Sequence, residues 1–258
     1  MLAKERRDKI YDMIVKNGAI ETAKAASALN VSIETLRKDL ISMEREGLIL
    51  RTHGGAVNTD AMRKSYALSQ RSEEYIAEKE NLVSKACELI ADGDIIAIDE
   101  GSTAKILAES IKDKFKNLTV ITYSLDVFNV LCGEEGFKLI LCGGNYMKKE
   151  KCFYGAQTLD ALNNLYFQKA FIFPAAVSLK SGICINNENF IPLFKQLMSA
   201  AEQVYILADS SKFEKKALFK ISDTDKKFNF VTDCNLSEDL KNLYKRHKMK
   251  LFVGGKSK

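Results

Sequence analysis

The chain has few of the residues from which catalytic and metal sites are most often built. It has only two histidines, His53 and His247, whose wide separation in the sequence argues against a histidine-based nucleophile relay. Its six cysteines form no C-x-x-C pair and have no histidine nearby. This spacing argues against a zinc site and favours buried or incidental thiols in a reducing cytoplasm. We therefore expect no metal and no cofactor.

The chain also lacks the segments that direct a protein to a membrane. It has no run of about 18 apolar residues, the length that a membrane span requires. Its first residues, MLAKERRDKIYDMIVKNG, are too highly charged for a signal peptide. We expect a cytoplasmic protein with no membrane partner.

The 258 residues, of which 46% are hydrophobic, are enough for one large domain or two smaller ones. The formal net charge of +5 is mildly basic. Such a charge permits binding to nucleic acid but does not argue for it.

Residues 1–57 predict three short helices followed by a hairpin. AKERRDKIYDMIVKNG carries a helical apolar stripe and is expected to end at Gly18. ETAKAASALN predicts a second helix, and VSIETLRKDLISMEREG a third, with Ser32 as N-cap and Gly47 at its end. LILRTHGGAV then predicts two short strands about a glycine turn.

Two helices joined by a short turn, the second with basic and small polar residues near its start, form the helix-turn-helix pattern of DNA-binding proteins. The candidate DNA contacts on the second of these helices and on the hairpin, read as a wing, are Ser32, Thr35, Arg37, Lys38, Arg51 and His53. By pattern alone, a small helical bundle with solvated charges is an equally good interpretation, because residues 1–57 hold ten Lys and Arg against eight Asp and Glu.

Residues 58–75 are polar with no strong period, and predict a linker that is in part helical. From residue 76 to 258, apolar runs alternate with amphipathic helical patterns such as 102–115 and 189–202. Continuous apolar strands interleaved with helices predict a mostly parallel α/β sheet covered on both faces. The runs are 94–99, 118–123, 137–142, 169–173, 203–208, 228–232 and 249–253.

Four of these strands are followed by polar or glycine-containing loops: DEGSTAK, TYSLD, CGGN and ADSSKF. Loops at the carboxyl ends of parallel strands gather at one edge of the sheet, where ligands bind. Hydroxyls and amides at a helix start suit an anion. These loops predict a small anionic ligand, with candidate contacts from Asp99, Gly101, Ser102, Thr103, Thr122, Ser124, Gly143, Gly144, Asp209 and Lys212.

Residues 5–57 resemble the winged helix of the DeoR family of bacterial transcriptional regulators. The resemblance rests on ERR..I, VS..TLRKDL and GLI.R.HGGA, and on the spacing between these blocks. It places Arg37, Lys38 and Asp39 at the family's RRD segment, with Lys38 where Arg is usual. It implies binding to operator DNA, usually as a repressor, by a homodimer or homotetramer.

Residues 76–235 are similar to the DeoR sensor domain, which is related in fold to ribose-5-phosphate isomerase. The matching blocks are D.GST, T.S, GG, F.G, SLKSG, K..M with Lys195, and ADSSKF. The resemblance implies a phosphorylated sugar or polyol as effector. The chain departs from the family at Tyr123, Pro174 and Ile191, where Asn, Gly and an acidic residue are common.

Two alternatives to a ligand-controlled regulator remain. One is a sugar-phosphate isomerase, which would need a positioned base and a group to stabilise an enediolate. The DNA-reading module, which an isomerase does not need, argues against it. The other is a DNA-binding regulator whose sensor has lost its ligand and only oligomerises, an alternative raised by the three departures from the family pattern.

Overall fold

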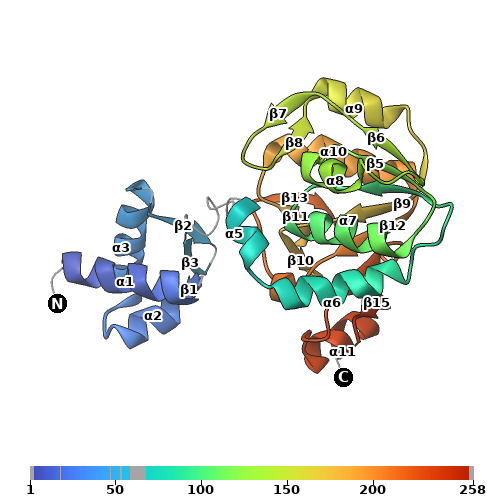
Figure 1. Cartoon of the computed structure of the whole chain (residues 1–258). Coiled ribbons are helices and arrows are strands. Elements are labelled where there is room, and N and C mark those ends of the chain that lie inside the picture. Colours follow the sequence, from blue (N-terminus) through green and yellow to red (C-terminus); the bar gives the residue numbers. More distant parts are fainter. Residues whose placement is uncertain (1–2, 18, 47, 53, 59–67, 256–258) are drawn as a thin grey trace. The chain divides into compact units, whose positions relative to one another are not determined.

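The computed structural model divides the chain into two compact units, residues 1–65 and 66–258 (Figure 1). It describes residues 3–17, 19–46, 48–52, 54–58 and 68–255. The predicted ends of two helices at Gly18 and Gly47 lie outside the described residues. Within those residues, no helix is both long enough and apolar enough to cross a bilayer.

The first unit is a winged helix-turn-helix. Its helices are α1 (Ala3–Asn17), α2 (Thr22–Ala28) and α3 (Ile33–Arg45). Its strands are β1 (Ala19–Glu21), β2 (Ile49–Thr52) and β3 (Gly55–Asn58), which pair antiparallel in the order β1-β3-β2. The three helices and the hairpin are as predicted, whereas no pattern in the sequence predicted the short strand β1. The apolar stripes of the helices meet in one core, which includes Ile10, Ile14, Leu36, Leu40 and Met43.

The second unit is built on a seven-stranded, wholly parallel sheet in the order β15-β14-β12-β9-β4-β5-β6. The strands are β4 (Ile95–Ile98), β5 (Leu118–Thr122), β6 (Phe137–Leu141), β9 (Phe167–Ile172), β12 (Ala201–Leu207), β14 (Asn229–Thr232) and β15 (Lys250–Val253). Each corresponds to one of the seven predicted apolar runs, which confirms the α/β class.

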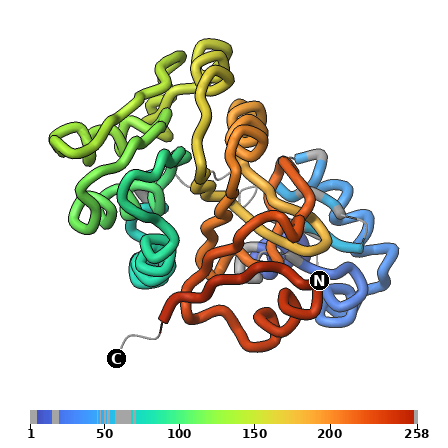
Figure 2. Tube along the Cα trace, turned by 90° about the vertical axis from the view of Figure 1, so that its right-hand side faces the viewer, coloured from blue at the N-terminus to red at the C-terminus, as the bar shows by residue number. Residues whose placement is uncertain are grey.

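Helices cover both faces of this sheet. One face packs against α6 (Ile76–Cys87), α7 (Ser102–Lys114) and α8 (Leu125–Leu131). The other packs against α9 (Ala156–Asn163), α10 (Ile191–Ala200) and α11 (Glu238–Arg246). Figure 2 shows the green half of the unit, with β4 to β6, on the opposite side from the orange and red half, with β12 to β15. The strand order therefore reverses between β4 and β9, at the centre of the sheet.

Two smaller sheets lie outside the predicted elements. One is a hairpin of β7 (Asn145–Met147) and β8 (Cys152–Tyr154). The other joins β10 (Ala176–Ser178), β11 (Gly182–Ile185) and β13 (Phe219–Ser222). Short 3₁₀ turns run over Glu188–Phe190 and Ser210–Lys212. None of these strands was predicted, because each is short and lies outside the alternation of apolar runs with helical patterns.

The expected linker over 58–75 is in part helical, as predicted, but its second half belongs to the second unit. Residues 68–73 form helix α5 (Leu68–Glu73), which belongs to the second unit and contacts α7. Leu68 is buried, and Arg71 forms an ion pair with Glu150. The second unit therefore begins before residue 76, because side chains in this polar segment have partners elsewhere in the unit.

Candidate functional site

The start of helix α3 presents the predicted DNA contacts to solvent. The hydroxyl of Ser32 caps the helix by accepting a hydrogen bond from the amide of Thr35 at 3.1 Å, as predicted. The two hydroxyls also lie 2.8 Å apart. Arg37 and Lys38 are exposed, and Arg37 has a loose partner in Glu34, at 3.6 Å. An exposed pair of this kind contributes little to stability, so Arg37 is available to another partner.

The wing lies next to this helix. A cleft in the first unit is lined by Arg37, Leu40, Thr22, Arg51 and Gly55, together with Ala23, Ile33 and Gly54. Two of the predicted DNA contacts, one on α3 and one on β2, thus share a cleft. Arg51 lies 3.7 Å from Glu44, and its own amide donates to the same carboxylate at 3.0 Å. His53, the remaining candidate, lies outside the described residues.

Two arginines of α1 position α3, and neither was predicted from the sequence. Arg6 donates to both carboxylate oxygens of Asp39, at 2.5 and 3.2 Å. Arg7 donates to Ser42 at 2.9 Å and to Glu46 at 2.7 Å. Asp39 is buried, so the acidic residue of the RKD segment holds α3 on α1 while its basic neighbours face outward. The sequence feature that could have indicated these contacts is the charged residue Asp39 on the buried side of the amphipathic helix α3.

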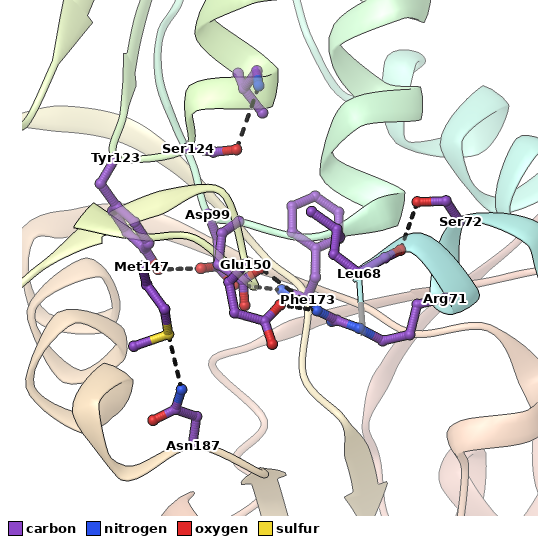
Figure 3. Close-up of polar contacts among 12 residues, drawn as sticks. Leu68, Arg71, Ser72, Asp99, Tyr123, Ser124, Met147, Glu150, Phe173 and Asn187 are labelled. Carbon is purple, nitrogen blue, oxygen red and sulfur yellow. Dashed lines mark hydrogen bonds and ion pairs between the residues drawn. The ribbon is translucent and has the colours of Figure 1, made fainter. Parts of the chain in front are cut away.

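The carboxyl end of β4 lies where the strand order reverses, and Asp99 follows it directly. Asp99 is fully buried. One carboxylate oxygen accepts a hydrogen bond from the hydroxyl of Tyr123 and the other from the amide of Phe173 at 3.1 Å (Figure 3). Burial raises the pKa of Asp99 to about 7, although these two hydrogen bonds lower it. Asp99 thus ties the end of β4 to the segments after β5 and β9.

Helix α7 begins immediately beyond, with Gly101 at its N-cap in a conformation of φ 123° that favours glycine. Ser102 and Thr103 form its first turn. Within the described residues, neither hydroxyl has a hydrogen-bond partner in the protein. Amides in the first turn of a helix also lack partners within the helix, so this end of α7 can accept an anion.

A cluster of charged residues surrounds this helix end, and its central members were not predicted from the sequence. Arg71 of α5 donates to Glu150, at the turn between β7 and β8, and lies 4.0 Å from Glu100 (Figure 3). Glu100 and Glu150 are buried. Burial raises the pKa of Glu100 to about 8, against the opposing effect of Arg71. Glu100 lies among the predicted ligand residues in the sequence, but no pattern predicted that Arg71, a residue of the expected linker, would lie beside it.

Asp209 and Lys212 join the same cluster from the loop after β12. Lys212 lies 3.4 Å from the buried carboxylate of Asp209, which also accepts a hydrogen bond from the amide of Ser211 at 3.2 Å. Burial raises the pKa of Glu100 and lowers that of Lys79; the positive charge of Lys212 opposes the first shift and adds to the second. Lys79 is itself buried, and burial is the main reason that its pKa falls to about 8.

The predicted hydroxyls after β5 have partners within the protein. Thr122 donates to the carbonyl of Ile98 at 2.8 Å and accepts from the amide of Ser124 at 3.0 Å. Ser124 caps α8 by accepting from the amide of Val127 at 3.3 Å. Both side chains are buried. Their hydroxyls therefore shape the loop at the carboxyl end of β5.

The remaining candidates are more loosely connected to the cluster. Gly143 is open to solvent, whereas a β-carbon at Gly144 would lie 2.2 Å from the hydroxyl of Thr158, so that glycine permits close packing against α9. Lys195 is exposed on α10, and within the described residues no hydrogen bond or ion pair joins it to another side chain.

The three departures from the family pattern lie at different depths. Tyr123 is fully buried with its hydroxyl on Asp99. Pro174 is buried between β9 and β10. Ile191 is half-buried at the start of α10. Of the three, Tyr123 makes direct contact with a predicted ligand residue.

Comparison with known proteins identifies the family. The model of the DeoR-like helix-turn-helix domain matches residues 6–61, and that of the DeoR C-terminal sensor domain matches residues 74–234. The chain belongs to the DeoR family. It is a DNA-binding transcriptional regulator, which confirms the prediction and excludes the isomerase as its function. The family's two domains correspond to the winged helix-turn-helix and to the parallel α/β unit of the structure.

Curated relatives match over nearly their whole length. The chain is 29% identical to the putative aga operon transcriptional repressor of Escherichia coli O157:H7, over 91% of this chain and 88% of the relative. It is 29% identical to the L-fucose operon activator of Haemophilus influenzae, over 94% and 96%. It is 31% identical to the lactose phosphotransferase system repressor of Streptococcus mutans, over 95% and 98%.

Among solved structures, ribose 5-phosphate isomerase A from Methanocaldococcus jannaschii is similar to the chain over 54% of each protein. The identity is 18% and the TM-score is 0.39. At so low a TM-score, this similarity carries no conclusion about fold or activity.

Proposed function

We propose that this regulator represses genes of sugar or polyol metabolism and that a phosphorylated sugar controls its affinity for operator DNA. The observation that carries the proposal is the loop after β12, where Lys212 lies 3.4 Å from the buried carboxylate of Asp209, because this loop and the start of α7 lie at the same edge of the parallel sheet. Ser102 and Thr103 form the first turn of this helix, where amides and helix dipole favour a phosphate group, and neither hydroxyl has a hydrogen-bond partner among the described residues.

The roles of the candidate residues follow from this arrangement. Gly101, Ser102 and Thr103 would hold the phosphate, with Lys212 as its counter-charge. Asp209 would orient Lys212. Asp99, Thr122 and Ser124 would hold the loops in place, because the protein itself occupies their side chains. Gly143, Gly144 and Lys195 would lie toward the sugar.

On the DNA, Arg37 would read base edges, since its guanidinium can bond two acceptors of a guanine. Ser32, Thr35, Lys38, Arg51 and His53 would contact the backbone of the duplex. Helix-turn-helix proteins bind paired half-sites as dimers, so we expect a homodimer or homotetramer in the cytoplasm. Light scattering after size exclusion, with and without operator DNA, would measure that state.

The test of the effector is thermal unfolding of the full chain in the presence of sugar phosphates, with each free sugar as control. A ligand that binds only the folded protein stabilises it by about 2.7 kcal/mol at 100 times its dissociation constant. We expect a rise in Tm with one phosphate ester, absent with its free sugar. The rise should disappear in Lys212→Ala and persist in Lys215→Ala, which removes an exposed lysine three residues away.

The same ester should then change the affinity for DNA. A duplex selected from a random pool by the full chain, followed by fluorescence anisotropy, provides that measurement. If no ester shifts the Tm, the sensor does not bind a phosphosugar, and the alternative of a domain that only oligomerises replaces this proposal. A ligand that shifts the Tm but leaves DNA affinity unchanged would contradict control by that ligand, because it would bind both states equally.

A further inference from the structure

Helix α5 is held on the second unit by contacts at the edge of the candidate site. Leu68 is buried, and Arg71 bonds to Glu150 (Figure 3). Lys79 donates from its buried ammonium to the backbone carbonyls of Arg71 and Glu74, the second at 2.5 Å. These carbonyls lie at the end of α5, where backbone acceptors lack partners within the helix. The position of α5 thus depends on a few polar contacts, one of which is made by Arg71.

The guanidinium of Arg71 lies against the start of α7. A β-carbon built on Gly101, the N-cap residue of α7, would lie 3.8 Å from Nη1 of Arg71. Nη2 of the same side chain bonds to Glu150. An anion held by the first amides of α7 would therefore lie beside a guanidinium that now faces a carboxylate.

Two buried carboxyl groups lie beside Arg71. Glu100 and Glu150 are both buried and both lie close to this one guanidinium. Oε2 of Glu100 is buried without a hydrogen-bond partner among the described residues, and it lies 4.0 Å from Arg71. A phosphate arriving here competes with Glu150 for the guanidinium, so its charge is best met by a cation that can change partner. Arginine suits this role, because its planar fork bonds carboxylate and phosphate in the same geometry.

We propose that Arg71 binds the phosphate group of the effector, exchanging Glu150 for it, and that α5 moves with the exchange. The inference rests on the proposed function, since it assigns a further ligand residue and a route of regulation to the same site. Residues 59–67 alone separate α5 from β3, the last strand of the DNA-binding unit. A shift of α5 therefore changes the point at which the DNA-binding unit is attached. Because α5 has a different position in each state, ligand binding and DNA binding are coupled.

The exchange of Glu150 for phosphate predicts that substitutions of Arg71 and of Glu150 change phosphate affinity in opposite directions. Arg71→Gln removes the cation that the phosphate recruits, so binding of inorganic phosphate by the full chain should weaken by about tenfold. Glu150→Gln removes the competing carboxylate, so binding should tighten by a similar factor. If the ion pair only held the fold together, phosphate binding would weaken in both variants. Glu88→Gln, which removes the exposed partner of Lys85 on α6, is the matched control and should leave binding unchanged.

Calorimetric titration with inorganic phosphate measures these affinities, and near-ultraviolet circular dichroism checks that each variant is folded. Hydrogen exchange in the unmodified chain is the second measurement, and it does not depend on any variant. Phosphate should speed exchange of the amides of residues 69–75. In Glu150→Gln these amides should exchange fast without phosphate.

Several results would overturn the inference. Equal changes of phosphate affinity in Arg71→Gln and Glu150→Gln would overturn it. So would an unchanged phosphate affinity in Arg71→Gln. Hydrogen exchange in α5 that does not respond to phosphate would also overturn it. If phosphate binds the unmodified chain and is lost in Lys212→Ala but not in Arg71→Gln, the proposed function stands and this inference fails. If neither phosphate nor any phosphate ester binds the unmodified chain, both fail.

Discussion

The hydroxyl of Tyr123 donates a hydrogen bond to the carboxylate of Asp99 in the interior of the second unit, where neither side chain is exposed. The amide of Phe173 donates to the other oxygen of the same carboxylate, at 3.1 Å. The segments after three neighbouring strands, β5, β4 and β9, are thereby joined at the point where the strand order reverses. A residue that departs from the family pattern thus takes part in building the floor of the candidate site.

Tyr123→Phe should destabilise the second unit by about 1–3 kcal/mol, because it leaves one oxygen of a buried carboxylate without its donor. The loss should be larger at pH 8 than at pH 5, since the ionised form of Asp99 needs the donor most. Urea unfolding at the two pH values measures it. Tyr146→Phe, which removes an exposed hydroxyl, should have no effect. Equal losses at both pH values would show that the tyrosine acts only through packing.

Glu100 should make the stability of the second unit depend on pH. Its pKa is raised from 4.5 to about 8 by burial, so the folded protein keeps a proton that the unfolded chain releases. The resulting stability is fully present below pH 4.5 and is lost as the pH rises to about 8, at up to about 1.4 kcal/mol per pH unit.

Glu100→Gln cannot titrate, so its free energy of unfolding should fall less steeply than that of the unmodified chain between pH 5 and 8. Denaturant unfolding at several pH values gives both slopes, and Glu80→Gln, at an exposed position on α6, is the control. A slope unchanged in Glu100→Gln would mean that this carboxyl is ionised throughout the range.

The two neighbouring glycines of the wing should differ sharply in their response to alanine. A β-carbon on Gly55 would lie 1.8 Å from the carbonyl oxygen of Ile20, whereas one on Gly54 would meet nothing within 4 Å. Gly55→Ala should therefore force β1 and β3 apart and destabilise the first unit by about 1–3 kcal/mol or more. Gly54→Ala should be nearly neutral. Calorimetry of the two variants compares them directly, and equal Tm values would contradict the close approach of the two strands.

The two basic residues at the front of α3 should affect DNA binding in different ways. Arg37→Ala should cost about 1–3 kcal/mol on the selected duplex and relax the preference at one base pair. Lys38→Ala should weaken binding by the same factor on all DNA sequences. It should also reduce the slope of the logarithm of affinity against the logarithm of salt concentration by about 1. Anisotropy titrations over a range of salt concentrations distinguish the two effects. Lys9→Ala, at an exposed position of α1, is the control. An equal loss of affinity on all DNA sequences in Arg37→Ala would mean that Arg37 contacts the DNA backbone instead of a base.

Long-range contacts explain why part of the candidate site was missed. The apolar runs that became the seven strands are continuous, because such strands are buried on both faces, and each run is visible without its partner. Arg71 is different. It lies in a polar segment with no period, and its partner Glu150 is 79 residues away. Likewise, β11 pairs with β13 across Ile183 and Ser222, and neither segment shows its partner in its own pattern.

Local physical chemistry decided what could be derived from the sequence by itself: the cap at Ser32, the stripes that form the core of the first unit, the seven strands, and the gathering of polar loops at one edge of the sheet. Each follows from the periodicity of a single segment and from the geometry of parallel strands. Only the tertiary structure decided which polar groups have hydrogen-bond or ion-pair partners within the protein. It set Tyr123 on Asp99, Asp39 on Arg6, and Arg71 between two buried carboxylates. Charge and burial act through space, so these partners are decided by the packing of segments that lie far apart in the chain.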